Sequence, residues 1–269
     1  MIELTDELHG RLERAAELVL GARYTVALVG AGLSVESGIP PFRGPGGIWT
    51  KYGEPRMLAY REFARDPGGW WENRLRDEEE EGNPVREMKL AADRAAPNAG
   101  HFALVEMGRL GLLKCTVTQN VDNLHRRAGS QELLEIHGNR AWLRCIDCGR
   151  RRPREGFPLL DLPPRCPDCG GVIKADTVMF GEPIPPAVLQ ACLEQAERCD
   201  CMLLVGTSGS VNPAARLPLV ARERGAALIE VNPHSTSLTP ICDVALSGPS
   251  GELLPLLVER LRPGPPPAG

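Results

Sequence analysis

Apolar and polar positions alternate along this chain in two different rhythms, which predict helices and buried strands in turn. In residues 5–20 the apolar side chains recur at spacings of three, four and seven, as they do on one face of a helix. The next run, Thr25–Val29, is apolar or β-branched at every position and ends at a glycine. Such a run predicts a strand that is buried on both faces of a sheet.

The same two rhythms recur along the rest of the chain. Further buried strands are predicted at residues 113–118, 201–206 and 227–232, with a weaker one at 243–246. Helical patterns are found at residues 101–110, 186–197, 214–224 and 252–261. Strands that alternate with helices are typical of a parallel sheet with helices on both faces. The sequence therefore predicts an α/β fold with a Rossmann-like sheet.

Two stretches break this alternation and predict a second, smaller domain. Residues 45–97 are punctuated by glycine and proline and contain five consecutive acids at 77–81, so we expect a helical insertion with a solvated, charged turn. Residues 140–174 contain two close pairs of cysteines. We expect these stretches to form the small domain, beside a Rossmann-like domain made of residues 1–44, 98–139 and 175–262 and a flexible tail at 263–269.

Composition and charge narrow the class of protein without changing this picture. Of 269 residues, 42% are hydrophobic and 25% are charged, and the net charge of −4 does not favour a broad nucleic-acid-binding surface. No apolar run approaches the length of about 18 residues that a membrane-spanning helix needs. The first eight residues lack a basic and apolar leader. We therefore expect a cytoplasmic protein that has no membrane contact, for which nucleic acid is not the favoured partner, and which is by default a monomer.

Four of the nine cysteines form two Cys-x-x-Cys pairs. Cys145 pairs with Cys148, Cys166 pairs with Cys169, and 17 residues separate the pairs. Such pairs can present four thiolates to one zinc ion, and four protein ligands leave no open coordination position, so the zinc is expected to be structural. A redox dithiol is an alternative, but it needs only one pair. A nucleic-acid-binding zinc ribbon also stays open, because arginines cluster at residues 150–154.

A glycine turn, Gly30-Ala31-Gly32-Leu33-Ser34, follows the first predicted strand. A turn of this kind lets backbone N–H groups approach a diphosphate at the start of a helix. Taken alone it is an incomplete dinucleotide fingerprint, because Val35 stands where the third glycine belongs. The turn by itself indicates a nucleotide-binding α/β domain, and a tight turn that binds nothing is the alternative.

Several further motifs occur in the order in which the sirtuin family has them. They are residues 34–44 (Ser-Val-Glu-Ser-Gly-Ile-Pro-Pro-Phe-Arg-Gly), residues 118–125 (Thr-Gln-Asn-Val-Asp-Asn-Leu-His), His137-Gly138, the four cysteines, residues 178–182 (Val-Met-Phe-Gly-Glu), Gly206-Thr207-Ser208 and Val231-Asn232. The chain resembles the sirtuins, in their bacterial type, over residues 8–261. The resemblance implies an NAD-dependent protein-lysine deacylase, most simply a deacetylase, in which the Rossmann-like domain binds NAD and the zinc is structural.

The resemblance also implies roles for single residues. In this family the ADP-ribosyl group of NAD passes to an acyl-lysine of a protein or peptide, which yields nicotinamide, lysine and O-acyl-ADP-ribose. We expect His137 to be the general base, since an unperturbed histidine pKa of ~6.5 suits proton transfer at neutral pH. Asn120 is expected to orient the ribose and a water. The other residues expected at NAD are Gly30, Ala31, Gly32, Ser34, Ile39, Phe42, Arg43, Gln119, Asp122, Gly206, Thr207, Ser208 and Asn232, and those expected along the peptide are Val178, Phe180, Gly181 and Glu182.

The acyl group is the least defined part of this expectation. Sirtuins that remove succinyl or malonyl groups carry Tyr-x-x-Arg in the insertion, where the arginine binds the acyl carboxylate. Arg74 and Asp77 stand at these positions here, and Asp77 would repel a carboxylate, although Arg76 is an alternative cation one residue away. We therefore expect neutral acyl groups such as acetyl. Two other functions stay open, namely NAD-dependent ADP-ribosyl transfer or NAD hydrolysis, and a non-enzymatic, zinc-containing NAD sensor.

Overall fold

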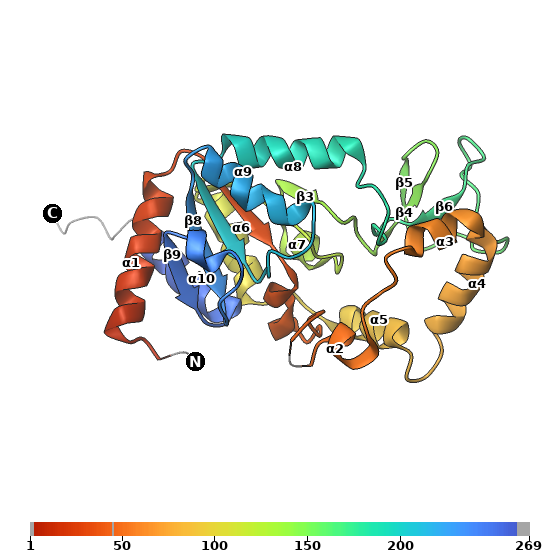
Figure 1. The fold of residues 1–269 in the computed structure, drawn as a ribbon, viewed down its shortest axis with the longest axis horizontal. Coiled ribbons are helices and arrows are strands. Elements are labelled where there is room, and N and C mark those ends of the chain that lie inside the picture. The colour runs from red at the N-terminus through yellow and green to blue at the C-terminus, as the bar shows by residue number, and fades with distance from the viewer. Residues whose placement is uncertain (1–2, 45, 263–269) are drawn as a thin grey trace.

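A computed structural model describes residues 3–44 and 46–262 of the protein. The chain forms two lobes that lie side by side along the long axis (Figure 1). A six-stranded sheet with helices on both faces forms the larger one, called the sheet lobe. The small lobe contains a three-stranded sheet and helices α2 to α5. The predicted α/β architecture with a smaller second unit is confirmed.

The large sheet is entirely parallel, with strand order β3-β2-β1-β7-β8-β9. Its strands are β1 (Thr25–Val29), β2 (Leu113–Thr118), β3 (Leu133–Glu135), β7 (Cys201–Val205), β8 (Ala227–Asn232) and β9 (Val244–Ser247). From β1 the strand order runs outward through β2 to β3 on one side, and from β7 it runs outward through β8 to β9 on the other, so the order reverses between β1 and β7. Ligands of such sheets bind where this reversal opens a crevice at the carboxyl ends of the strands.

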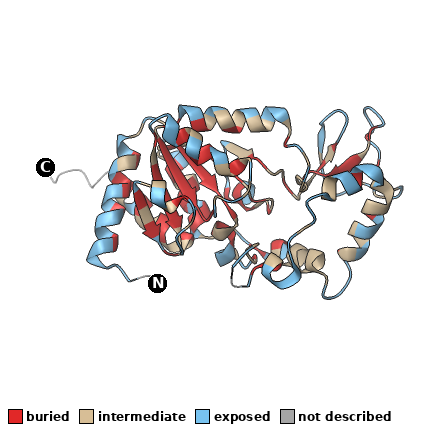
Figure 2. Cartoon of the chain, viewed as in Figure 1, coloured by how far each residue is buried: buried red, intermediate tan, exposed pale blue. Residues whose placement is uncertain are grey.

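Helices cover both faces of this sheet because alternate side chains of each strand point to opposite faces. In β1, Ala27 and Val29 join one apolar cluster, whereas Val26 and Leu28 join the other. The burial pattern in Figure 2 follows from this arrangement, since the central strands are buried along their whole length. The first face is covered by α1 (Asp6–Gly21), α6 (Ala99–Arg109) and α10 (Ser250–Leu261), and the second by α8 (Pro186–Arg198) and α9 (Leu217–Glu223).

The small lobe combines the two stretches that broke the sequence pattern. Its antiparallel sheet, in the order β5-β4-β6, packs beside the helical insertion. Trp71 is fully buried, and its Nε1 donates a hydrogen bond to the backbone oxygen of Ile173 at 2.8 Å. The elements are α2 (Ile48–Tyr52), α3 (Ala59–Arg65), α4 (Pro67–Asp77), α5 (Pro84–Arg94), β4 (Trp142–Cys145), β5 (Arg151–Pro153) and β6 (Ile173–Ala175).

Two local expectations differ from the structure. The segment after β1 is a 3-10 helix, Ala31–Ser37, which ends where Gly38 adopts a φ of 86°. The acidic run at 77–81 is not wholly solvated, because Glu78 is buried and pairs with Arg74 and with Arg154 of the cysteine stretch. A buried carboxylate requires such partners, and a charge pattern within one segment does not reveal a partner from another. The flexible tail expected at 263–269 lies outside the described residues.

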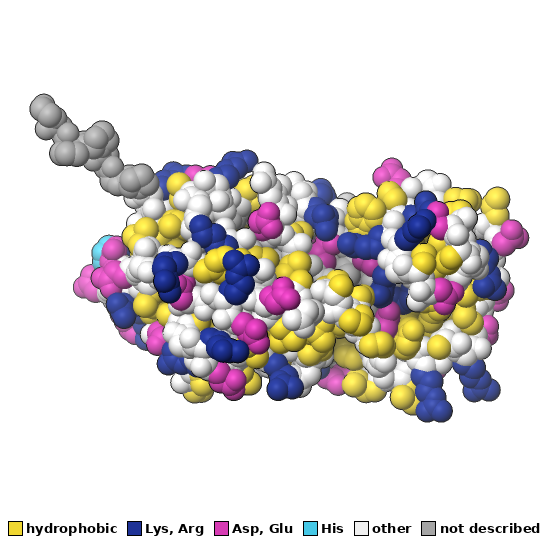
Figure 3. Space-filling model, turned by 90° about the horizontal axis from the view of Figure 1, so that it is seen from above, with side chains coloured by type: hydrophobic (Ala, Val, Ile, Leu, Met, Phe, Trp, Pro, Cys, Tyr) yellow, Lys and Arg dark blue, Asp and Glu magenta, His cyan; other side chains and the backbone are white. Residues whose placement is uncertain are grey.

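The surface carries charges of both signs. On the face drawn in Figure 3, basic and acidic side chains are interspersed over both lobes, with apolar side chains between them. Among the helices within residues 3–44 and 46–262, none combines the length and the apolar character required to cross a membrane.

Candidate functional site

Two glycine turns meet back to back where β1 and β7 end. The N–H of Gly30 donates to the backbone oxygen of Val205, and the N–H of Gly32 donates to that of Gly206, both at 2.9 Å. A Cβ atom on Gly32 would lie only 2.6 Å from the Cα of Gly206, whose own φ is 57°. The close approach of two backbones therefore requires glycine at both turns. No sequence pattern predicted this contact, because the turns are far apart in the chain.

Beside these turns, three of the residues expected at NAD form a buried polar cluster. Ser34 Oγ donates to Asp122 Oδ2 at 2.7 Å, and Asn120 Nδ2 donates to the Gly30 oxygen at 3.0 Å and to Ser34 Oγ at 3.2 Å. Burial raises the pKa of Asp122, although a bond from the N–H of Leu124 opposes the change. Because both partners of the Asn120 amide are fixed, its plane has one orientation at the sheet edge.

A second group joins the carboxyl ends of β2, β7 and β8. Gln119 Nε2 donates to Thr207 Oγ1 at 2.8 Å, and Asn232 Nδ2 donates to the Thr207 backbone oxygen at 2.9 Å. Ser208 is exposed, and its hydroxyl lies 2.8 Å from that of Ser210. The structure thus brings together residues that the sequence motifs placed on three separate strands.

The remaining turn residues expected at NAD surround this cluster. Ile39 is buried and packs with Leu124 and with Ala92 of α5, so that α5 contacts the segment that follows the 3-10 helix. Ala31 is half-buried at the start of the 3-10 helix. These two residues contribute apolar surface rather than polar groups to the site.

His137 lies at the junction of the two lobes, just after β3. Its Nδ1 is 3.1 Å from the backbone oxygen of Gln119, and its own backbone oxygen accepts a bond from the N–H of Val178 at 2.9 Å. A carbonyl oxygen can only accept, so Nδ1 carries the proton and Nε2 presents a lone pair. Burial lowers the pKa of His137 below its usual 6.5. The imidazole is therefore neutral at neutral pH and able to accept a proton.

Three aromatic rings connect the loop around Phe42 to the segment 178–182. The Trp49 ring lies 4.9 Å from Phe42 and 5.5 Å from Phe180, measured between ring centroids. The guanidinium of Arg43 lies 4.6 Å from the centre of the Trp49 ring. Phe42, Arg43 and Phe180 were expected at the site, whereas Trp49 was missed, since no spacing rule links it to the two phenylalanines.

Glu182, expected along the peptide, has a buried side chain. Its carboxylate accepts bonds from the N–H of Met179 at 2.8 Å and from Arg144 at 2.6 Å, and it pairs with Lys174 at 3.1 Å. The side chain thus closes the turn of its own segment. Together these bonds hold the segment 178–182 in one shape beside His137.

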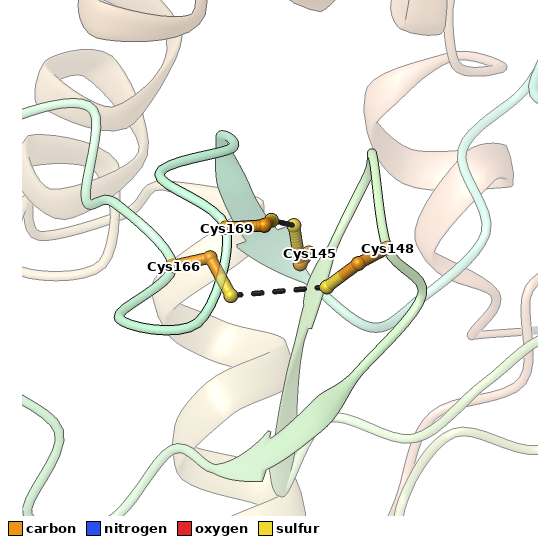
Figure 4. Close-up of side chains that lie close together, drawn as sticks. All are labelled: Cys145, Cys148, Cys166 and Cys169. Atoms are coloured by element: carbon orange, nitrogen blue, oxygen red, sulfur yellow. Dashed lines mark hydrogen bonds between the residues drawn. The ribbon is translucent and has the colours of Figure 1, made fainter.

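The four paired cysteines come together at one end of the small lobe (Figure 4). All four Sγ atoms lie within 4.8 Å of one another, with 3.6 Å between Cys145 and Cys169 and 3.8 Å between Cys148 and Cys166. Tetrahedral zinc with bonds of about 2.3 Å to sulfur sets its ligands about 3.8 Å apart. The donor set fits one structural zinc ion and leaves no coordination position for a substrate.

Known proteins share this combination of fold and motifs. Residues 30–213 match the model of the Sir2 family. NAD-dependent protein deacylase 1 of Archaeoglobus fulgidus is 41% identical over 250 residues, which are 93% of this chain and 98% of that protein. A solved Sir2 homologue–NAD complex has a TM-score of 0.76 and 40% identity over 93% of both chains. A Sir2 variant with deacetylated p53 peptide and 3'-O-acetyl ADP ribose has a TM-score of 0.77 and 31% identity over 92% of this chain and 97% of that one. The chain belongs to the Sir2 family, the sirtuins.

Proposed function

We propose that the protein is an NAD-dependent protein-lysine deacylase that acts chiefly as a deacetylase. It converts NAD and an acyl-lysine into nicotinamide, lysine and O-acyl-ADP-ribose. The observation that carries this proposal is the position of His137, which is bonded on one side to the Gln119 backbone and on the other to Val178. The relative named as a deacylase and the complexes with NAD and with acetyl ADP ribose support the same activity.

NAD, when bound, supplies the ADP-ribosyl group that receives the acyl oxygen. The N–H groups of Gly30 and Gly32 are used within the protein, so these glycines permit the close turn rather than donate to a phosphate. Arg43 and Ser208 lie on either side of Ser210 and offer a cation and a hydroxyl to the diphosphate. Asn120 and Asp122 would hold the nicotinamide end of NAD, and Asn232 and Thr207 would hold the adenosine end.

His137 acts as the general base. Its Nε2 lone pair accepts a proton from a ribose hydroxyl, while the bond from Nδ1–H to the Gln119 oxygen keeps the ring in the required tautomer. The lowered pKa means that the ring does not need to lose a proton first. The aromatic stack of Phe42, Trp49 and Phe180 excludes water from the reacting face.

Neutral acyl groups are the favoured substrates. Two arginines lie at or next to the positions where related sirtuins bind an acidic acyl group, and both already have an acidic partner. Arg74 pairs with Glu78 at 2.8 Å, and Arg76 pairs with Asp77 at 3.5 Å. Rates with acetyl- and succinyl-lysine forms of one peptide test this preference, and faster removal of succinyl would contradict it.

The division of the chain into two domains is part of the same proposal. Residues 1–44, 98–139 and 175–262 form the NAD-binding domain, and residues 45–97 and 140–174 form the small domain. The packing of Trp71 from one stretch against Ile173 from the other supports the second grouping. The cytoplasmic location expected from the sequence is also part of the proposal.

Steady-state release of nicotinamide tests the activity itself. The wild type releases nicotinamide in the presence of NAD and an acetyl-lysine peptide, whereas in His137→Ala and Asn120→Ala the release falls to a slow residual rate. His9→Ala is the matched control, since His9 is an exposed histidine on α1, in the sheet lobe far from the site. Equal release by the wild type and by both site variants would contradict the proposal.

A further inference from the structure

A chain of ion pairs built on three buried carboxylates lies beside the His137 loop and joins the two lobes. Its acids are side chains from the end of β3, from the residue after β6 and from the segment 178–182, and most of its cations come from the three strands of the small sheet. The acids are Glu135, Asp176 and Glu182, and the cations are Arg126, Arg144, Arg151 and Lys174. None of the three buried carboxylates has a role in the proposed reaction.

Asp176 is the member of the chain that contacts the His137 loop. Its Oδ2 accepts a bond from the N–H of Asn139 at 2.9 Å and another from Arg151 at 2.7 Å, while Arg144 lies 3.4 Å from Oδ1. Only 5% of this side chain is exposed. Because Asn139 follows His137 by two residues, the carboxylate fixes the point at which the chain leaves the histidine.

The backbones on either side of this bond are also in direct contact. Gly138 has a φ of 74°, and a Cβ atom there would lie 2.2 Å from the backbone oxygen of Asp176. One residue earlier, the His137 oxygen accepts the bond from Val178, where the peptide segment begins. Residues 137–139 and 176–178 are therefore in direct backbone contact, and this contact ties His137 to the segment expected along the peptide.

Glu135 holds the other end of the same loop. Arg126 donates to both of its oxygens, at 2.9 and 2.7 Å, and Arg151 reaches it at 3.2 Å. Burial raises the pKa of Glu135, but the bonds from Arg126 and Asn139 outweigh this and hold the pKa below its usual value. Arg151 thus bridges the carboxylates at the entry and the exit of the loop.

We propose that Asp176 is a positioning residue for deacylation, which holds the His137 loop against the peptide segment with Arg151 of the small sheet as its counter-charge. The inference rests on the proposed function of His137. A displacement of a reacting group by about 1 Å can lower a rate by about 100-fold, so a released loop would affect catalysis more than binding.

Asp176→Asn tests this role, because it keeps the size of the side chain and removes its charge. With an acetyl-lysine peptide, we expect kcat to fall about 10- to 100-fold while the KM for NAD changes less than about threefold. The matched control is Asp200→Asn, just before β7, at the amino ends of the strands and away from the site. Asp200 also accepts backbone N–H bonds, from Tyr24 at 2.8 Å and from Arg23 at 3.0 Å. The control should leave kcat unchanged, and an equal fall in kcat would overturn the proposal.

A double-mutant cycle separates positioning from general loss of structure. If Asp176 acts through His137, then adding Asp176→Asn to His137→Ala lowers the slow residual deacylation no further. Losses that multiply would overturn the inference while leaving the proposed function intact. Absence of deacylation by the wild type would overturn both. Should Asp176→Asn fail to fold, Arg151→Gln, at a half-exposed side chain, is placed in the same cycle with the same two outcomes.

Discussion

The sheet lobe and the small lobe hold their parts of the site by different means. In the sheet lobe, apolar clusters cover both faces of six parallel strands, and the close contact of Gly32 with Gly206 shapes the NAD site. In the small lobe, the apolar cluster around the three-stranded sheet has only five buried residues, and two of these, Cys145 and Cys166, belong to the four cysteines that fit a zinc ion. A large core lets backbone geometry position a site, whereas a small core depends on metal and buried charge.

His137 stands between these two systems. Its side chain is bonded to the sheet lobe through Gln119, and its backbone is bonded to the segment that follows the small sheet through Val178. The site therefore needs both lobes, but different changes should disrupt each one. The sheet lobe should be sensitive to changes at its backbone contacts, and the small lobe to loss of metal or of buried charge.

Removal of zinc should cause the largest effect and should be confined to the small lobe. Structural zinc contributes an apparent folding free energy of about 10–16 kcal/mol in small zinc domains. Trp49, Trp70, Trp71 and Trp142 are the four tryptophans of the chain, and all lie in elements of the small lobe. Chelation should therefore change tryptophan fluorescence and abolish deacylation, while far-UV circular dichroism retains most of the helical signal. Added zinc should restore activity, and full activity of metal-free protein would contradict the account.

Gly206→Ala should damage the sheet lobe through its backbone. The new Cβ would lie 2.4 Å from the backbone nitrogen of Leu33, and the φ of Gly206 is positive. Strain and overpacking together should lower the free energy of unfolding by about 2–4 kcal/mol. Gly225→Ala is the control, since its φ of 87° is also positive but nothing lies within 4 Å of a Cβ there. Denaturant unfolding of both variants measures the difference, and equal losses would show that the contact between the turns is unimportant.

The pH dependence of kcat should report on His137 at the junction. Burial lowers the pKa of His137 from 6.5, so the neutral base is the main form above pH 6.5 and is lost as the pH falls through the lower pKa. Below that pKa, kcat should fall about tenfold for each pH unit. Rates with an acetyl-lysine peptide on the acid side of neutrality measure the midpoint. A midpoint above pH 6.5 would indicate that another group limits the reaction.

Glu78→Gln should have the smallest effect and should again be confined to the small lobe. Glu78 is buried and pairs with Arg74 and Arg154, so loss of its charge should lower the free energy of unfolding by about 1–2 kcal/mol. Asp77→Asn next to it is the control, because Asp77 is more exposed and lies 3.5 Å from Arg76. Thermal unfolding followed by tryptophan fluorescence compares the two variants. Equal changes in the unfolding temperature of the two variants would show that burial of the charge makes no difference to stability.

The sequence predicted the sheet well because buried parallel strands produce continuous apolar runs that need no partner to be recognised. Three predicted strands, including Thr25–Val29, have the observed bounds, and the two others differ by one residue. The zinc site was equally visible in the spacing of its cysteines. The family, the NAD-dependent activity and the structural zinc are confirmed by the comparisons and by the cysteine geometry. The roles of single residues such as His137 remain predictions.

The ion pairs could not be predicted, for a physical reason. Asp176, Arg151 and Glu135 come from three separate segments, and a charge pattern along one segment carries no information about the approach of another. The contact between Gly32 and Gly206 is hidden for the same reason, since each glycine alone is compatible with an ordinary turn. His137 itself has no local pattern, and only the motifs around it distinguished it from the other histidines.

The reaction products distinguish NAD-dependent deacylation from ADP-ribosyl transfer and from NAD hydrolysis. The wild type is incubated with NAD and an acetyl-lysine peptide, and the products are quantified by mass spectrometry, with His137→Ala as the control. We predict nicotinamide, deacetylated peptide and O-acetyl-ADP-ribose in equal amounts from the wild type, and a near-complete loss of all three in the variant. Free ADP-ribose beside a peptide that is still acetylated, or a peptide that carries ADP-ribose, would contradict it.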